Sequence, residues 1–210
     1  MYETKENHSY GIIAIIYYCI YFISMLIAGR FYKENNMPGI YITCLAAFAV
    51  GIIIVFVKEG HIRSLGFGKE KIKTNLAISL AIIIIEFIIV LFISGLTFVD
   101  ALKQMLYYLF FIAAIEEVVF RGIIQNYLCG FRINKWLLFT IGAVLFSLSH
   151  IPFQMYVHNE VSIYYFVSAI PNLIETFVFH FIFCYIAYRR KDITLSIAIH
   201  FAYDFLGIIF

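Results

Sequence analysis

Two adjacent glutamates and an arginine lie in one of the most apolar stretches of the sequence. Glu116, Glu117 and Arg121 occur between Leu109 and Gly122, where the other side chains are hydrophobic. A charge near the middle of a membrane helix costs at least ~2.5–3.5 kcal/mol on insertion scales. Three charges within six positions therefore need partners, a water-filled cavity or a function that offsets this cost.

Helical geometry divides the three charges into two groups. Glu117 and Arg121 are four residues apart, so they share a face of a helix and are predicted to form an ion pair. Glu116 points about 100° away from Glu117. We therefore expect Glu117 and Arg121 to support the helix, and Glu116 to face a neighbouring segment.

The same four-residue spacing recurs in two later apolar segments. Phe146 and His150 form one pair, and His200 and Asp204 form the other. If their helices are neighbours, the two histidines, Asp204 and Glu116 would share a cavity. Two imidazoles and two carboxylates suit the activation of water and the stabilisation of an oxyanion. The same four side chains are also a plausible zinc site.

The composition places these residues in an integral membrane protein. Of the 210 residues, 63% are hydrophobic and 13% are charged, whereas a soluble domain carries about 25% charged residues. No basic patch suits nucleic acid. A spanning helix needs ~20 mostly apolar residues. The candidate spans are roughly 10–29, 39–57, 76–97, 103–128, 136–153, 171–188 and 193–210. We therefore predict an all-α, polytopic transmembrane bundle of about seven spans, with the active-site cavity between the fourth, fifth and seventh.

Lysine and arginine placement predicts the orientation of these spans. A cytoplasmic N-terminus would place on the cytoplasmic side Lys5, Lys58, Arg63, Lys69, Lys71, Lys73, Arg132, Lys135, Arg189, Arg190 and Lys191. It would leave only Arg30, Lys33 and Lys103 outside. Cytoplasmic loops of membrane proteins are enriched in these residues, so the N-terminus is expected inside. The basic loop 58–73 could also hold anionic lipid.

Other polar residues in the apolar segments have less specific explanations. Glu86 stands alone in its span and is best explained by a hydrogen bond between helices. Glu175 and His180 in the sixth span are possible cavity residues. The four cysteines show no CxxC spacing, and we expect them to be packing residues: Cys19, Cys44, Cys129 and Cys184.

Three motifs in order resemble a known family. They are Glu-Glu-x-x-x-Arg (116–121), Phe-x-x-x-His (146–150) and His-x-x-x-Asp (200–204). They resemble the CAAX-protease and bacteriocin-processing (CPBP, Abi) family of intramembrane glutamic or metallo-endopeptidases. The resemblance covers about residues 100–207, whereas residues 1–99 match only in hydropathy. We therefore expect one integral membrane domain, 1–210, with N-terminal spans in 1–99 and a catalytic core in 100–207.

The resemblance implies a glutamate-dependent endopeptidase that needs no cofactor. Glu116 would be the general base on the attacking water, and His150 would help to hold that water. His200 and Asp204 would stabilise the tetrahedral oxyanion. Residues that support the site would be Glu117, Arg121 and Phe146. In the alternative zinc-dependent form, the ligands would be Glu116, His150, His200 and Asp204.

Two positions depart from the family pattern. The eukaryotic enzyme of this family has asparagine where this chain has Asp204. An ionised aspartate cannot donate a hydrogen bond to an oxyanion, so Asp204 would be protonated, orient His200 or bind a metal. His180 stands where the family often has a small residue, and it would narrow the cavity or add a polar group to it.

Two further function classes remain open. A non-proteolytic membrane adaptor or a bacteriocin self-immunity protein would keep the fold without the chemistry. A proton-coupled transporter would use the same side chains as a proton relay, although the sequence shows no internal repeat of the kind many transporters have. For the leading function we expect a peptide or membrane-protein substrate and a prokaryotic cell membrane as the location.

Overall fold

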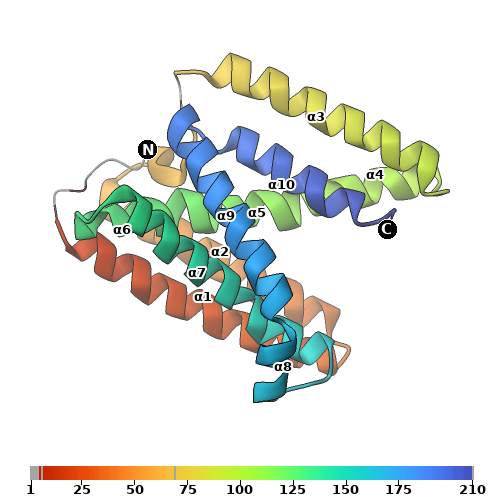
Figure 1. Ribbon diagram of the computed structural model, residues 1–210, viewed down its shortest axis with the longest axis horizontal. Helices are drawn as coiled ribbons and strands as arrows, with labels where there is room; N and C mark the ends of the chain where they lie inside the picture. The colour runs from red at the N-terminus through yellow and green to blue at the C-terminus, as the bar shows by residue number, and fades with distance from the viewer. Residues whose placement is uncertain (1–4, 6, 69, 210) are drawn as a thin grey trace.

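The structure is all helical over the residues it describes. It is a computed structural model that describes residue 5 and residues 7–68 and 70–209, and these residues contain helices and no strand (Figure 1). Among them, five helices are long and apolar enough to cross a membrane: α1 (Ser9–Lys33), α2 (Met37–Glu59), α3 (Ile72–Ile93), α7 (Lys135–Val157) and α9 (Ile170–Arg190). They coincide with five of the predicted spans. The predicted all-α, polytopic bundle is therefore confirmed.

The predicted fourth span is one continuous helical run that alternates between α-helix and other helix types. Its parts are α4 (Phe98–Leu106), the π-helix η2 (Tyr107–Ala113), α5 (Ala114–Glu117), the π-helix η3 (Val118–Ile124), α6 (Gln125–Leu128) and the 3₁₀ turn η4 (Cys129–Phe131). Both glutamates of the first motif lie in α5, between the two π-helical stretches. Such stretches are rare in proteins and often occur at functional sites.

The predicted seventh span is shorter than the sequence suggested. Its helix, α10 (Thr194–Leu206), has 13 residues and is therefore only ~20 Å long, against a hydrocarbon core ~30 Å thick. Turn residues follow Leu206, and residue 210 lies outside the described residues. The number of full crossings therefore stays a prediction.

The central run, from α4 to η4, is surrounded by the other helices. Helix α1 packs against α2 and α7, α7 packs against α9, and α10 packs against α3 and η2. The 3₁₀ turn η1 (Ile62–Leu65) packs against η3, and the six-residue α8 (Ile163–Ser168) connects α7 to α9. Figure 1 shows α5 running through the middle of this arrangement, beneath α10 and α9. Residues 117–130 of the central run are therefore all buried.

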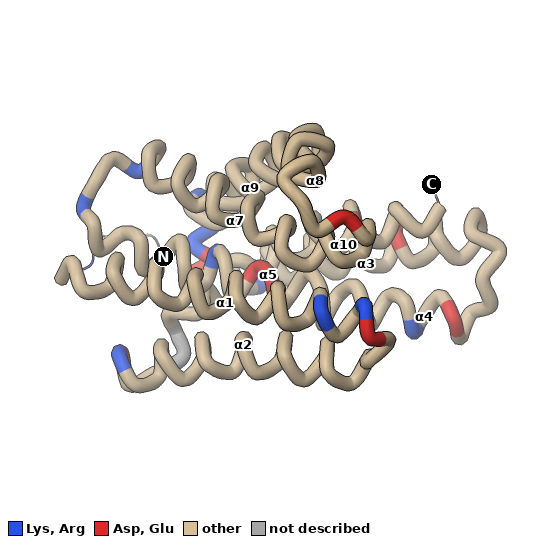
Figure 2. Tube along the Cα trace, turned by 90° about the horizontal axis from the view of Figure 1, so that it is seen from below, with Lys and Arg blue, Asp and Glu red and all other residues tan. Residues whose placement is uncertain are grey.

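Charged residues concentrate near the helix ends, with few along their middles (Figure 2). The end of the bundle where α1 begins and α2 stops is held by two contacts of Lys5. Its Nζ lies 3.2 Å from Glu59 Oε1, and its carbonyl oxygen accepts a hydrogen bond from Arg132 Nε at 3.2 Å. Arg30 and Lys33 lie at the opposite end of α1. The orientation of the bundle in the membrane stays a prediction.

Candidate active site

Glu117 and Arg121 form the predicted ion pair inside the bundle. Arg121 Nη1 lies 3.0 Å from Glu117 Oε1, and neither side chain is exposed. The guanidinium also lies over two aromatic rings, 4.4 Å from the centroid of Phe146 and 5.1 Å from that of Phe183. Such cation–π contacts are strongest where water is excluded. Arg121 therefore anchors the central run to both α7 and α9.

Glu117 has a second partner that the sequence did not reveal. Its Oε1, the atom that faces Arg121, also lies 2.9 Å from Nδ1 of His200 on α10. A carboxylate beside an arginine accepts hydrogen bonds, so Nδ1 carries a proton and donates it. This bond fixes the orientation of the imidazole. Glu117 thus links the ion pair to the histidine of the third motif.

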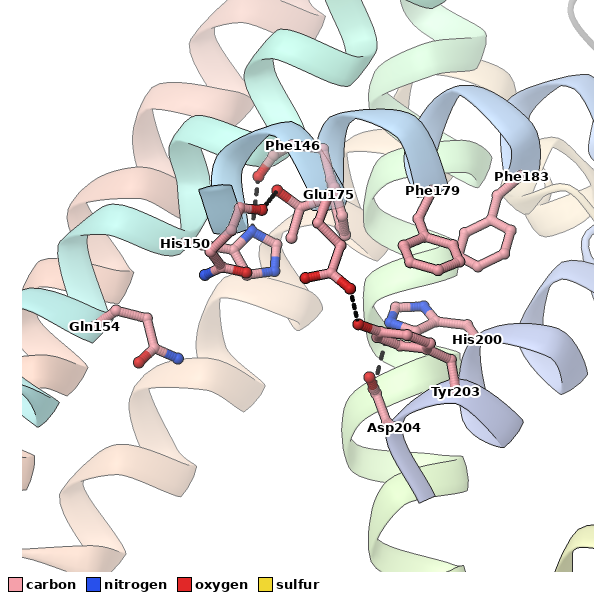
Figure 3. A pocket seen from close by; sticks show the side chains of 11 residues that line it. Phe146, His150, Gln154, Glu175, Phe179, Phe183, His200, Tyr203 and Asp204 are labelled. Carbon is pink, nitrogen blue, oxygen red and sulfur yellow. Dashed lines mark hydrogen bonds and ion pairs between the residues drawn. The ribbon is translucent and has the colours of Figure 1, made fainter. Parts of the chain in front are cut away.

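The other nitrogen of His200 faces the remaining carboxylates. Nε2 lies 3.8 Å from Glu116 Oε2 and 3.4 Å from Asp204 Oδ2, the contact drawn in Figure 3. The Phe183 ring stacks on the imidazole, with 5.4 Å between the centroids. The predicted shared face of His200 and Asp204 is therefore present, and Glu116 is turned toward it.

His150 is positioned by its own motif partner. Its Nδ1 lies 2.9 Å from the carbonyl oxygen of Phe146, and a carbonyl can only accept, so Nδ1 donates. Nε2 of the neutral ring is then left as an acceptor. The Phe146 ring lies edge-on against the imidazole at 4.7 Å. The four-residue spacing thus gives Phe146 two contacts with His150, one from its backbone and one from its side chain.

One cavity of about 340 Å³ is lined by all four candidate catalytic residues, Glu116, His150, His200 and Asp204. The fourth, fifth and seventh predicted segments contribute these side chains. Helices α1 and α2 also form part of the wall, which the sequence did not predict. The remaining wall residues are mostly apolar and include Tyr21, Met25, Ile40, Cys44, Tyr107 and Phe111.

A second cavity of about 170 Å³ shares His150, Gln154, His200 and Asp204 with the first and extends toward α9. Glu175, one of the two possible cavity residues, lines it and accepts a hydrogen bond from the Tyr203 hydroxyl (Figure 3). Sequence reasoning missed Gln154 and Tyr203. Gln154 follows His150 by four residues, so the motif spacing contained a signal for it. Tyr203 immediately precedes Asp204, and the motif spacing contained no such signal for it.

His180, the other possible cavity residue, lines neither cavity. It is fully buried, and its Nε2 lies 3.1 Å from Cys184 Sγ. Its ring packs on that of Phe146, with 5.0 Å between the centroids. His180, Cys184 and Ala187 form the buried face of α9, whereas Glu175 lies on an exposed part of the helix. The expectation that His180 narrows the cavity is therefore wrong. Glu86 on α3 also lies outside both cavities.

The four candidate zinc ligands do not form a metal site as they are placed. Over the described part of the chain, no group of three or more His, Cys, Asp or Glu side chains is gathered closely enough to hold an ion. Nδ1 of each histidine donates to another group, the Phe146 carbonyl in one case and Glu117 in the other, so Nε2 is the nitrogen that could bind a metal. We therefore derive no step through zinc.

Comparison with known proteins gives one match. A family model described as "Type II CAAX prenyl endopeptidase Rce1-like" matches residues 98–206. No curated protein and no solved structure matches the chain. The matched range runs from the first residue of α4 to the last residue of α10, so it contains all three motifs and both cavities' histidines.

Proposed function

The chain belongs to the Rce1-like family of type II CAAX prenyl endopeptidases, and from this premise we propose that it hydrolyses peptide bonds of a membrane-associated or peptide substrate. It is an integral membrane protein with the fold of this protease family. The observation that carries the proposal is the approach of Glu116 to His200. Their side chains face each other across 3.8 Å in a cavity that His150 and Asp204 also line.

Glu116 is the general base in the proposed reaction. Its Oε2 is buried and has no hydrogen-bond partner among the described residues. A water bound between this oxygen and His150 Nε2 would lose a proton to the carboxylate as it attacks the scissile carbonyl. General-base catalysis of this kind contributes typically ~10²–10⁴-fold to the rate. The leaving amine would then take the same proton from Glu116.

His200 stabilises the oxyanion in the proposed reaction. With Nδ1 donating to Glu117, a second proton on Nε2 makes the ring a cation that donates into the cavity. Asp204, 3.4 Å from Nε2, favours this cationic form. In this assignment Asp204 is a positioning residue for His200, and its departure from asparagine does not remove the oxyanion donor.

The test is peptide release by purified protein in liposomes. Glu116→Gln and His200→Gln should each lower release from added membrane peptides by at least ~10²-fold, since each removes one chemical role. Glu34→Gln is the matched control, because Glu34 pairs with Arg30 at an exposed helix end. Peptide release by this variant should equal that of the wild type. Unchanged release by both site variants would contradict these catalytic roles, and absence of release by the wild type would favour the adaptor or immunity alternative.

A zinc-dependent form of the same protease is the second candidate. Its support is the approach of a histidine nitrogen to two carboxylates, Glu116 and Asp204, which are chemically suitable ligands. We predict less than one zinc per chain by elemental analysis and full cleavage in the presence of a chelator. Loss of cleavage with chelator, restored by added zinc, would instead establish the metal-dependent form.

A further inference from the structure

The two cavities beside the candidate catalytic residues differ in chemistry. The larger has mostly apolar walls from α1, α2 and η2, beside the carboxylates of Glu116 and Asp204. The smaller contains two carboxylates, Glu175 and Asp204, and two amides, Gln154 and Asn172. Its described lining includes no lysine or arginine. A substrate that lies across both cavities would therefore meet mostly apolar side chains on one side of His150 and His200, and Glu175 with two amides on the other.

Glu175 is held in place although it is exposed. It lies near the start of α9, and the Tyr203 hydroxyl on α10 donates to its Oε1 (Figure 3). The Tyr203 ring packs against that of Phe179, with 4.4 Å between the centroids, so the phenol that fixes the carboxylate is itself held by α9. No described basic side chain forms an ion pair with Glu175. Glu175 lines the smaller cavity, so its carboxylate is available to a ligand there.

A carboxylate beside aromatic rings is a suitable environment for an organic cation. Carboxylates form strong, charge-assisted hydrogen bonds with ammonium and guanidinium groups, and aromatic faces attract the same cations. Phe179 and Tyr203 supply such rings in the lining, whereas Phe146 and Phe183 already face Arg121. The volume of about 170 Å³ exceeds that of a few waters, each of which takes ~30 Å³ in the liquid, and suits one side chain.

We propose that the smaller cavity is a subsite for a cationic group of the substrate, the amine or guanidinium of a lysine, an arginine or a free N-terminus, and that Glu175 determines this specificity. The inference rests on the proposed peptidase function, because it names a property of that substrate. Since His150, His200 and Asp204 line both cavities, the cationic group would lie within a residue or two of the scissile bond.

In the first step, the purified protein in liposomes is incubated with a proteome-derived peptide mixture. Mass spectrometry then identifies the peptides that are cleaved and the residues beside each cut. One cleaved peptide with a lysine beside the cut is then resynthesised with norleucine, which keeps the hydrocarbon stem of lysine and removes its charged amine. Wild type should prefer the lysine peptide, and Glu175→Gln should lower the lysine-to-norleucine ratio of kcat/KM about tenfold, as expected for a lost hydrogen bond to a charged group. Acetylated versions of both peptides show whether the N-terminal amine is the cation instead.

Two further variants make the test specific. Glu160→Gln removes the same charge from the loop before α8, outside both cavities, and should leave the ratio unchanged. Glu175→Lys should reverse the preference, toward a glutamate in place of the lysine. A ratio that does not change in Glu175→Gln overturns the inference, as does a fall of the same size in Glu160→Gln.

Binding separates failure of the subsite from failure of the proposed function. Absence of cleavage by the wild type would contradict the peptidase proposal. Fluorescence anisotropy of labelled lysine and norleucine peptides with Glu116→Gln protein would still test the subsite. Tighter binding of the lysine peptide, lost when Glu175→Gln is added, supports it, and equal binding of the two peptides contradicts it.

Discussion

At the scale of single residues, Glu117 connects the stability of the site to its chemistry. One oxygen of this buried carboxylate faces both Arg121 and His200, at 3.0 and 2.9 Å. Removing Arg121 alone would leave a buried negative charge without its main partner. Removing both charges would leave neither charge of the pair without its partner, but His200 would lose the negative charge that favours its cationic form. Stability and activity should therefore respond differently to the same pair of changes.

We predict that Arg121→Met destabilises the protein by about 3–5 kcal/mol, the usual cost of breaking a buried ion pair. The double variant Glu117→Gln/Arg121→Met should regain most of this stability, because no unpaired charge remains. Thermal unfolding in detergent measures both effects.

Peptide release by the same proteins tests the role of Glu117 at His200. The double variant should remain at least tenfold less active than the wild type, although it is stable. A double variant that regains both stability and activity would show that Glu117 only neutralises Arg121 and that His200 does not depend on it.

At the scale of elements, the sequence predicted what depends on local spacing. Five spans follow from length and hydropathy, and the four-residue spacings correctly placed Glu117 with Arg121 and His200 with Asp204. The π-helical stretches were not predictable, because the apolar run 107–124 contains no residue pattern that distinguishes them from α-helix. The contact between Glu117 and His200 joins residues 83 apart. It depends on how α10 docks, which no local pattern specifies.

The central run is held against η1 by a close backbone contact at Gly122. A Cβ at this position would lie 2.3 Å from the carbonyl oxygen of Leu65. The nearby side-chain amide of Asn126 donates to the Ser64 carbonyl at 3.1 Å. A backbone neighbour cannot rotate away as a side chain can, so any substitution must separate the two elements.

Gly122→Ala should therefore destabilise the protein by about 1–3 kcal/mol, the usual cost of overpacking, and should lower activity because Arg121 is the adjacent residue. Thermal unfolding and peptide release measure the two effects. Gly207→Ala is the control, since a Cβ there would come no closer than 3.1 Å to another atom. Equal stability of the two variants would show that η1 can move away from Gly122 without a loss of stability.

At the scale of the whole molecule, the cavities lie toward the end of the bundle opposite to Lys135, Arg189 and Arg190, the end where Arg30 and Lys33 of α1 also lie. On α7, His150 is 15 residues, or ~22 Å, from Lys135 and only about 10 Å from the end of the helix at Val157. Glu175 lies near the start of α9, while Arg189 and Arg190 lie at its end. If the basic end is cytoplasmic, as expected for membrane proteins, the cavities lie in the outer half of the membrane.

The two ends of α7 provide a direct test of this orientation. In a protein without its native cysteines, Glu160→Cys, just beyond the end of α7, should react with a membrane-impermeant maleimide in intact cells. Lys135→Cys, at the start of the same helix, should react only after the cells are permeabilised. The reverse pattern would place the cavities toward the cytoplasm and contradict the predicted cytoplasmic N-terminus. Because one helix carries both positions, the result also fixes the side from which a substrate must reach Glu116: with the predicted pattern, its scissile bond has to be presented from the outer face.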